Sequence, residues 1–255
     1  MRFLLTRRWI MFLLAVVVLA LACVRLGEWQ FQRLHDREQR NGWTQTNLEA
    51  GPAPVDDVLS VGEPVPQERE WTQVTATGTY DAARTVVVRY QTRDGEAGVD
   101  LVTPLRTDAG PAVLVDRGWM ATQNTGTVPD DLPAPPPGIV SLTGWVRVDA
   151  EGDSTDVDDG STRAISSTAI GETLPYPVYG GFVDAETEDP AASTELVPAE
   201  LPDLGEGPHL FYGIQWWFFG ALALFGFCYL VYDELRRGRA GSEQRTTGTR
   251  PVSRT

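Results

Sequence analysis

Two long apolar stretches, one near each end of the chain, limit most strongly what this sequence can fold into. Residues 11–26 contain one charged residue, Arg25, and residues 211–232 are almost wholly apolar or aromatic. A bilayer core about 30 Å thick requires about 20 helical residues to cross it. With the flanking residues included, we predict two transmembrane helices, over residues 9–29 and 209–232.

The distribution of charge predicts the orientation of these helices. All 21 basic residues are arginine; three precede the first span and six follow the second, whereas residues 41–210 carry 29 acids against 8 arginines. Cytoplasmic flanks of membrane helices are enriched in basic residues. We therefore expect a multi-pass protein of a bacterial cell membrane with both ends cytoplasmic: an N-terminal tail (1–8), a disordered C-terminal tail (233–255) and an extracytoplasmic domain (30–208).

The N-terminus permits other interpretations. Arg7 and Arg8 before an apolar run also occur in secretory and twin-arginine signals, and the residues that end at Cys23 resemble a lipoprotein cleavage site. We favour an uncleaved anchor, because the apolar run exceeds a typical signal core and continues as a plausible helix to Arg33. Cys23 and Cys228 are predicted to lie at depths that differ by roughly 20 Å, which excludes a disulfide between them.

The central region shows the period-2 alternation of β-strands. Asp94-Gly95 is a typical hairpin turn, and the proline-rich residues 133–138 and the acidic residues 151–160 are predicted to be a linker and a loop. We expect a mainly antiparallel β domain, either a sheet or a small barrel of the α+β class, with a loop over 41–66 and a short helix from Ser166 or Ser167 to Glu172. The expected strands cover residues 71–80, 84–93, 98–105, 112–119, 140–148 and 176–185.

Catalysis is not predicted. The two histidines, His35 and His209, each lie within a few residues of a predicted membrane end, so the domain interior lacks a histidine base. We find no nucleophile elbow, phosphate-binding loop or zinc-protease motif, and no thiolate metal site. A membrane-tethered hydrolase is therefore a disfavoured alternative, and the acidic balance argues against nucleic-acid binding.

The most informative residues lie at the outer membrane boundary. On a helix, His209, Tyr212, Gln215 or Trp216, and Phe219 share one face. An aromatic belt with polar caps explains the aromatic residues. It explains less well two glutamines, Gln30 and Gln215, at similar depth on opposite helices; these are expected to bind each other or a group on another protein.

The motifs of the chain together resemble the surfeit locus protein 1 family, membrane factors for cytochrome c oxidase assembly. The order and spacing of the pieces carry the resemblance, which covers residues 27–219. Gly220 stands where alanine is usual, the acidic loop of residues 149–160 looks inserted, and the arginine-rich tail is long. The matching residues are Gly27, Trp29, Gln30 and Arg33; Gly78, Tyr80 and Asp81; Gly98 with Thr103, Pro104 and Leu105; Val115, Asp116, Arg117, Gly118 and Trp119; Pro137, Gly138, Thr143 and Gly144; and His209, Leu210, Tyr212, Gln215, Trp216 and Phe219.

This resemblance implies a non-enzymatic assembly factor for a haem-copper cytochrome c oxidase. It would aid haem a insertion or stabilise the core subunit, and its partners would be that subunit and the lipid bilayer. His209 becomes a candidate ligand for transiently bound haem a, with a helix cap or headgroup contact as the alternative. The Trp29-Gln30 and Gln215-Trp216 pairs are expected to contact oxidase helices, and residues 116–119 to be structural or docking residues. An accessory subunit retained in the mature complex is the alternative function.

Overall fold

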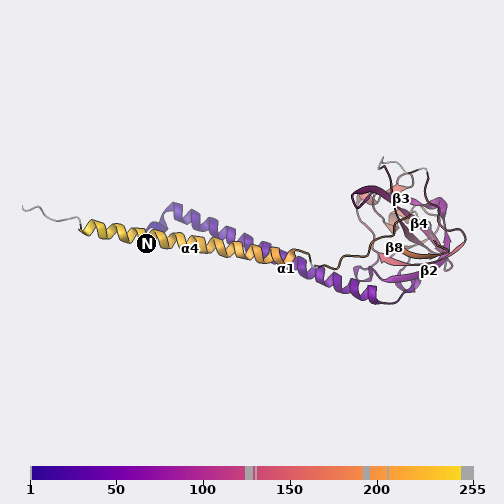
Figure 1. Cartoon of the computed structure of the whole chain (residues 1–255), viewed down its shortest axis with the longest axis horizontal. Coiled ribbons are helices and arrows are strands. Elements are labelled where there is room, and N and C mark those ends of the chain that lie inside the picture. The colour runs from indigo at the N-terminus through magenta and orange to yellow at the C-terminus, as the bar shows by residue number, and fades with distance from the viewer. Residues whose placement is uncertain (1, 124–128, 130, 192–195, 206, 248–255) are drawn as a thin grey trace, which may run out of the picture. The chain divides into compact units, whose positions relative to one another are not determined.

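The chain forms two compact units in a computed structural model (Figure 1). A helical unit comprises Met1–Gln39 and Gly205–Thr255, and a β domain comprises Arg40–Leu204. The structure describes residues 2–123, 129, 131–191, 196–205 and 207–247.

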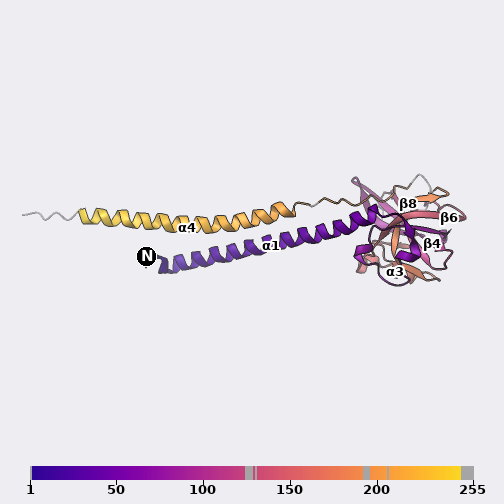
Figure 2. The same ribbon diagram turned by 90° about the horizontal axis from the view of Figure 1, so that it is seen from below.

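The helical unit consists of two long helices that run side by side, α1 (Arg7–Glu49) and α4 (His209–Thr247), after a short 3-10 helix η1 (Arg2–Leu5) (Figure 2). Both helices are long and apolar enough to cross a bilayer. A Cβ atom at Gly220 would lie 3.1 Å from that of Cys23. Small residues therefore let the two backbones approach closely.

Both helices continue beyond the predicted spans, which corrects two expectations. Helix α1 runs to Glu49, where a loop was expected from residue 41, and α4 runs to Thr247, within the tail expected to be disordered. Pairs at i and i+4 support these polar extensions: Gln32 donates to Asp36 at 2.9 Å, Gln45 to Glu49 at 3.0 Å, and Arg237 pairs with Asp233 at 2.8 Å. Residues 248–255 lie outside the described residues. Both cysteines are free, as predicted.

The β domain contains all six of the predicted strands, with ends that shift by a few residues. Alternation is confirmed best in β2, where Val74, Ala76, Gly78 and Tyr80 are buried between exposed or half-buried neighbours. The strands are β1 (Ala53–Pro54), β2 (Gln73–Tyr80), β3 (Val86–Arg93), β4 (Glu96–Thr107), β5 (Ala112–Ala121), β6 (Ile139–Arg147), β7 (Ser161–Thr162) and β8 (Val178–Asp189).

The pairing of the strands closes a small barrel. The sheet order is β1-β2-β6-β8-β5-β4-β3-β7, and β2 also pairs with β4, so that β2, β6, β8, β5 and β4 form a ring. The sheet is mixed rather than purely antiparallel. Most strand pairs are antiparallel, as expected, but β5 pairs with β8, β3 with β7, and β1 with β2 in parallel. Parallel strands require a long connection, and the chain between β5 and β8 and between β3 and β7 is long enough to provide one.

Three apolar clusters fill the domain, and the largest lies inside the ring. It contains residues from β2, β5, β6 and β8, among them Val113, Val140 and Val183, which have no exposed surface. Short helices cover the barrel or join its strands: α2 (Val55–Val58), η2 (Gln67–Arg69), η3 (Ala82–Arg84), η4 (Asp153–Thr155) and α3 (Ser167–Gly171). The predicted helix is confirmed in α3, whose Ser166 caps the Ala169 N–H.

Candidate functional site

One candidate site lies between the two helices, where His209 at the start of α4 meets Gln30 of α1. The His209 Nδ1 atom lies 3.0 Å from Gln30 Oε1. An amide oxygen only accepts hydrogen bonds, so Nδ1 is the donor in this contact and Nε2 takes no part in it. The expected contact between Gln30 and Gln215 is not made; Gln215 is exposed on α4.

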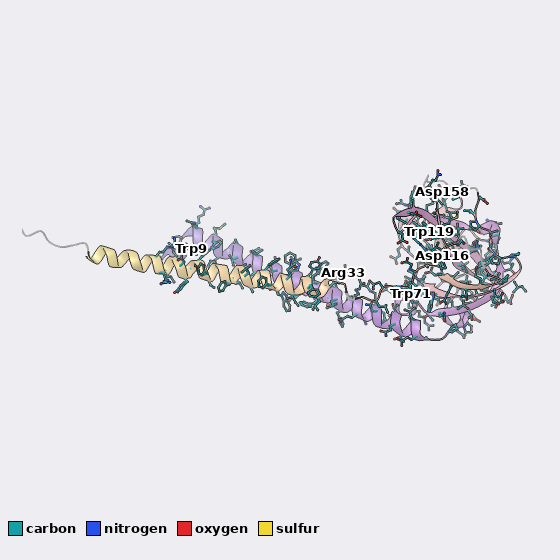
Figure 3. The ribbon with its side chains drawn as sticks, in the orientation of Figure 1. Trp9, Arg33, Trp71, Asp116, Trp119 and Asp158 are labelled. Carbon is teal, nitrogen blue, oxygen red and sulfur yellow. The ribbon has the colours of Figure 1, made fainter. Side chains whose placement is uncertain are left out.

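Aromatic side chains lie on the adjoining turns of the same two helices. A Cβ atom at Gly27 would lie 2.3 Å from the Trp217 indole, so the glycine provides the space that this ring occupies. The ring centroids of Phe31 and Trp217 are 4.8 Å apart. Trp29 is 52% exposed, with the Arg33 guanidinium 5.7 Å from its ring centroid. The helix pair therefore carries aromatic side chains on the turns next to the half-buried imidazole. Arg33, which lies over the Trp29 ring, is labelled in Figure 3.

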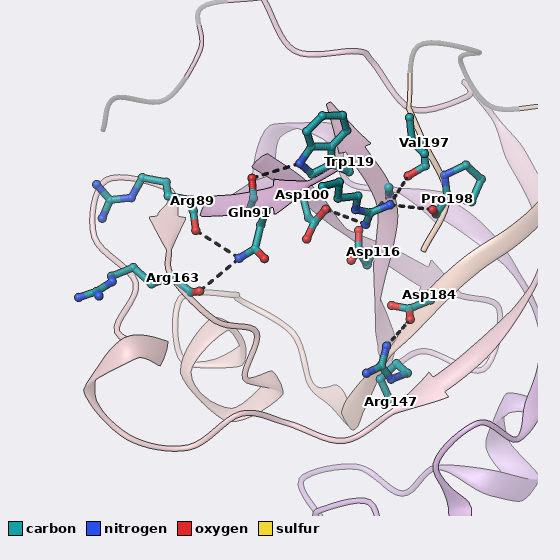
Figure 4. A network of polar contacts seen from close by, with 12 residues as sticks. Arg89, Gln91, Asp100, Asp116, Trp119, Arg147, Arg163, Asp184, Val197 and Pro198 are labelled. Carbon is teal, nitrogen blue, oxygen red and sulfur yellow. Dashed lines mark hydrogen bonds and ion pairs between the residues drawn. The ribbon is translucent and has the colours of Figure 1, made fainter. Parts of the chain in front are cut away.

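The β domain contains a second candidate site, a polar pocket of about 750 Å³. Three aspartates, Asp100 of β4, Asp116 of β5 and Asp184 of β8, line it from neighbouring strands. Asp116 and Asp184 are register partners in the parallel pair of β5 and β8. All three are at least nine-tenths buried (Figure 4).

Two arginines neutralise part of this acidic cluster. Arg93 pairs with Asp100 at 3.1 Å, and Arg147 pairs with Asp184 at 2.7 Å and with Glu70 at 3.1 Å. The Arg147 guanidinium also lies 4.2 Å from the ring centroid of Trp71. Arg147 is therefore held by ion pairs and by stacking.

Burial governs the protonation of the aspartates. It raises the pKa of Asp100 to about 6 despite the neighbouring Arg93. Burial, followed by repulsion from Asp100 and Asp184, raises the pKa of Asp116 well above its ordinary value. The pKa of Asp184 is also raised by burial, against the opposing effect of Arg147. Burial in the pocket therefore raises the proton affinity of all three carboxyl groups.

The side chains of the motif over residues 116–119 make different contacts: Asp116 lines the pocket, whereas Arg117 binds the linker before β6. Arg117 does not hydrogen-bond to Asp116; it donates instead to the carbonyl oxygens of Pro133 and Ala134 at 2.9 and 3.0 Å. Successive side chains of a strand point to opposite faces, so Arg117 and Asp116 have different surroundings. Arg117 thereby fixes the proline-rich linker before β6.

Gly118 and Trp119 hold the segment that leaves the domain. Gly118 has a φ of +119°, and a Cβ atom there would lie 2.6 Å from the Val197 carbonyl oxygen. Trp119 and Val197 exchange two backbone hydrogen bonds of 2.8 Å. Arg93 donates to the carbonyl oxygens of Val197 and Pro198. These hydrogen bonds hold the 196–198 segment, hereafter the 196–198 strap, against β5. Trp119 is 7% exposed and is therefore a core residue.

Sequence reasoning missed the pocket residues Arg93, Asp100, Arg147 and Asp184. A signal existed in β4 and β8, where Asp100 and Asp184 interrupt otherwise apolar runs. A charged residue at a buried strand position requires a partner or a function. Within the described residues, no group of three histidine, cysteine or acidic side chains has a geometry that fits a metal ion.

Comparison with known proteins bears on both sites. The model of the SURF1 family matches residues 17–221. The chain belongs to the SURF1 family. SURF1-like proteins of Mycobacterium bovis and Mycobacterium tuberculosis are 31% identical over 250 residues, which cover 94% of this chain and 90% of theirs. A SURF1-like protein of Rickettsia bellii is 22% identical over 224 residues, which cover 86% of this chain and 89% of its own.

One relative, from yeast, has a name that states a function. The Saccharomyces cerevisiae cytochrome oxidase assembly protein SHY1 is 30% identical over 99 residues, which cover 38% of this chain and 25% of the yeast protein. The stretch matched by the SURF1 family model includes the Gln30–His209 contact and the motif of residues 116–119.

Proposed function

We propose that this SURF1 family member is a membrane-bound assembly factor for a haem-copper cytochrome c oxidase and acts on the core subunit during haem a insertion. Family membership and the name of the yeast relative support the oxidase role. The single structural observation that carries the haem part is the contact between His209 and Gln30.

The arrangement of His209 and Gln30 suits a histidine that binds haem iron. Histidines that bind metals usually donate their second ring N–H to an oxygen, which fixes the tautomer and the ring orientation. Gln30 Oε1 provides that oxygen for Nδ1, so Nε2 is the atom that would bind iron. The aromatic side chains of Phe31, Trp29 and Trp217 offer apolar surface for a porphyrin. Bound haem would supply the iron centre that the core subunit requires.

We further propose that both helices cross the cell membrane with both termini cytoplasmic and the β domain outside. The excess of arginine at the chain ends and of acids in the domain supports this orientation. Trp29 of α1 and Gln215 of α4 are both exposed and would then contact oxidase helices. Tyr212 and Trp216, also on α4, would take part in the same contact.

A deletion strain tests the proposal. Wild type, His209→Ala and His35→Ala would be returned to it, and haem a in the membranes would be measured separately from assembled oxidase. His35 is exposed on α1 and is the matched control. We expect His209→Ala to lower assembled oxidase and haem that co-purifies with the protein, and His35→Ala to behave as wild type. Full oxidase activity in the deletion strain would contradict the assembly role.

The alternative function is that of an accessory subunit retained in the mature respiratory complex. Stoichiometric co-purification with active oxidase would favour it, whereas capture only while assembly is under way favours the assembly factor. The arrangement offers less support for a hydrolase, since the described β domain contains no histidine and its buried carboxylates are engaged by arginines or by a backbone N–H.

A further inference from the structure

A small cavity of the β domain is lined by two residues that each have a buried polar atom without a partner. The cavity, of about 280 Å³, lies between the end of β8 and the 196–198 strap, and its lining includes Arg117 and Glu188. Within the part of the chain that the structure describes, neither Arg117 Nε nor Glu188 Oε2 has a hydrogen-bond partner, and Arg117 is only 3% exposed. Buried polar atoms almost always have partners. A donor and an acceptor left open in one cavity therefore indicate a binding position for a ligand.

The other atoms of both groups are held in place. Arg117 Nη1 and Nη2 donate to the carbonyl oxygens of Pro133 and Ala134 at 2.9 and 3.0 Å. Because the guanidinium group is planar, these two bonds also fix the direction of the Nε–H bond. Glu188 Oε1 accepts the hydroxyl of Tyr80, which is 8% exposed. A turn of either group toward a new partner would therefore break hydrogen bonds that it already makes.

Arg117 and Glu188 carry opposite charges and lie close together without a direct hydrogen bond between the two open atoms. The Arg117 guanidinium lies 5.8 Å from the ring centroid of Tyr80, whose hydroxyl binds Glu188. Burial lowers the pKa of Arg117, and the neighbouring Glu188 carboxylate opposes this effect. Since neither open atom satisfies the other, space remains between them for a group that contacts both.

The cavity is accessible from the surface of the domain. Glu186 and Thr187 of β8 line it and are exposed, whereas Ala185 and Leu196 add apolar wall. Its volume is several times that of a water molecule, about 30 Å³, and lies near the lower limit of small-molecule sites, about 300 Å³. It can therefore admit a short side chain while the body that carries this side chain remains outside.

The two open atoms select a neutral group with one acceptor and one donor. An anion would be attracted by Arg117 but repelled by Glu188, and a cation would meet the opposite situation. A carboxamide has an oxygen that accepts and an NH₂ group that donates, in one plane and without net charge. Its oxygen would accept from Arg117 Nε and its NH₂ group would donate to Glu188 Oε2, so that both hydrogen bonds involve a charged group.

We propose that this cavity binds the side-chain carboxamide of an asparagine or glutamine from a partner protein, between Arg117 Nε and Glu188 Oε2. The inference is independent of the haem proposal, since it concerns residues of the β domain alone. The carboxamide satisfies both open atoms, and its CH₂ groups contact the apolar wall.

The full-length protein in detergent and three capped amino acids test this site. N-acetyl-glutamine methylamide presents the carboxamide; the glutamate and methionine analogues have a similar length, one with a charge and the other without a strong hydrogen-bonding group. We expect saturable binding of the glutamine probe in a ligand-observed NMR titration. Both analogues should bind at least about tenfold more weakly, because each leaves a buried group unpaired.

Three outcomes of this titration would overturn the proposal. They are no saturable binding of the glutamine probe, equal binding of the methionine analogue, and tighter binding of free glutamine than of the capped probe. The last result would assign the site to a free amino acid instead of a residue in a partner protein.

Glu188→Gln provides a test that a loss of folding cannot imitate. Its Oε1 atom can still accept the Tyr80 hydroxyl, while an NH₂ group replaces the open acceptor. Two donors then line the cavity, so the order of affinities should invert, with the glutamate probe at least about tenfold tighter than the glutamine probe. Asp156→Asn, in an exposed loop, is the matched control and should keep the wild-type order. A wild-type order in Glu188→Gln would contradict the assignment.

Discussion

At Gly78, strand β2 is paired with Val140 of β6 on one side and with Thr107 of β4 on the other. A Cβ atom there would come within 2.2 Å of the Arg106 carbonyl oxygen, which belongs to the backbone and cannot turn away. Gly78→Ala should therefore force β2 and β4 apart at the closure of the barrel and destabilise the domain by about 1 to 3 kcal/mol, the usual cost of overpacking.

Thermal unfolding of the full-length protein measures this effect. Gly51→Ala is the matched control, because a Cβ atom at Gly51 has no neighbour within 4 Å. Equal melting temperatures for the two variants would contradict the close approach of β2 and β4.

The buried aspartates make a prediction about pH. The pKa of Asp100 rises from 3.8 to about 6 on folding, and those of Asp116 and Asp184 rise as well. The folded protein thus binds these protons more tightly than the unfolded chain. Their stabilising contribution is complete below the ordinary aspartate pKa and is lost as the pH rises through the folded pKa.

Asp116→Asn should remove part of that dependence. The amide keeps the hydrogen bond with Gly118 and removes a repelled charge. We expect the melting temperature of wild type to be lower at pH 7.5 than at pH 5, and the difference to shrink in Asp116→Asn but not in Asp156→Asn. A variant as pH-sensitive as wild type would show that Asp116 does not contribute.

At the residue scale, the sequence predicted several candidate site residues but not the partners that they contact. His209 and Gln30 were both singled out, but Gln30 was expected to bind Gln215 or a group on another protein, and its contact with His209 was not predicted. Helical spacing gives the face on which a residue lies, but the axial offset between two helices decides which residues of the two faces meet. Asp100 was missed because its partner Arg93 lies across a hairpin, and only the turn brings the two together.

At the scale of elements, the strap between β5 and the 196–198 segment offers a test. Val197 donates its backbone N–H to the Trp119 carbonyl oxygen at 2.8 Å, and its side chain is 49% exposed. Val197→Pro removes this donor, so the segment should detach more readily, at a cost of about 1 kcal/mol for a lost hydrogen bond.

Limited proteolysis reports that detachment. Cleavage within the segment should be faster in Val197→Pro than in Val197→Ala, which loses most of the side chain but keeps the N–H group. Equal rates for both variants would mean that the side chain, and not the backbone pair, holds the strap.

Elements could be predicted from local patterns, whereas their pairing could not. Alternation of apolar and polar residues identified β2 and β6, and Asp94 and Gly95, with φ angles of 50° and 82°, form the expected hairpin turn. In β3, strict alternation would place Tyr90 on the same side as Val86 and Val88, but a bulge between Val88 and Gln91 leaves Tyr90 50% exposed. The parallel pairing of β5 with β8 depends on contacts distant in sequence, which periodicity does not encode.

At the scale of the whole molecule, the arginine distribution predicts the positions of both termini. A reporter that is active only in the cytoplasm, fused after Thr255, should be active, and the same reporter inserted at Asp156 in the acidic loop should be silent. An export-dependent reporter should give the opposite pair of results. Export-dependent activity at Thr255 would contradict two membrane crossings and, with them, the proposed approach of Trp29 and Gln215 to oxidase helices.

The chain enters and leaves the β domain at neighbouring points, since Asn41 donates its side-chain N–H to the Leu204 carbonyl oxygen at 2.8 Å. Segments whose ends meet in this way can be exchanged as a cassette, because a replacement must match only one short distance at the junction. A chimera that carries the corresponding cassette of a mycobacterial relative on the present helices would therefore assign each partner specificity to one half of the molecule.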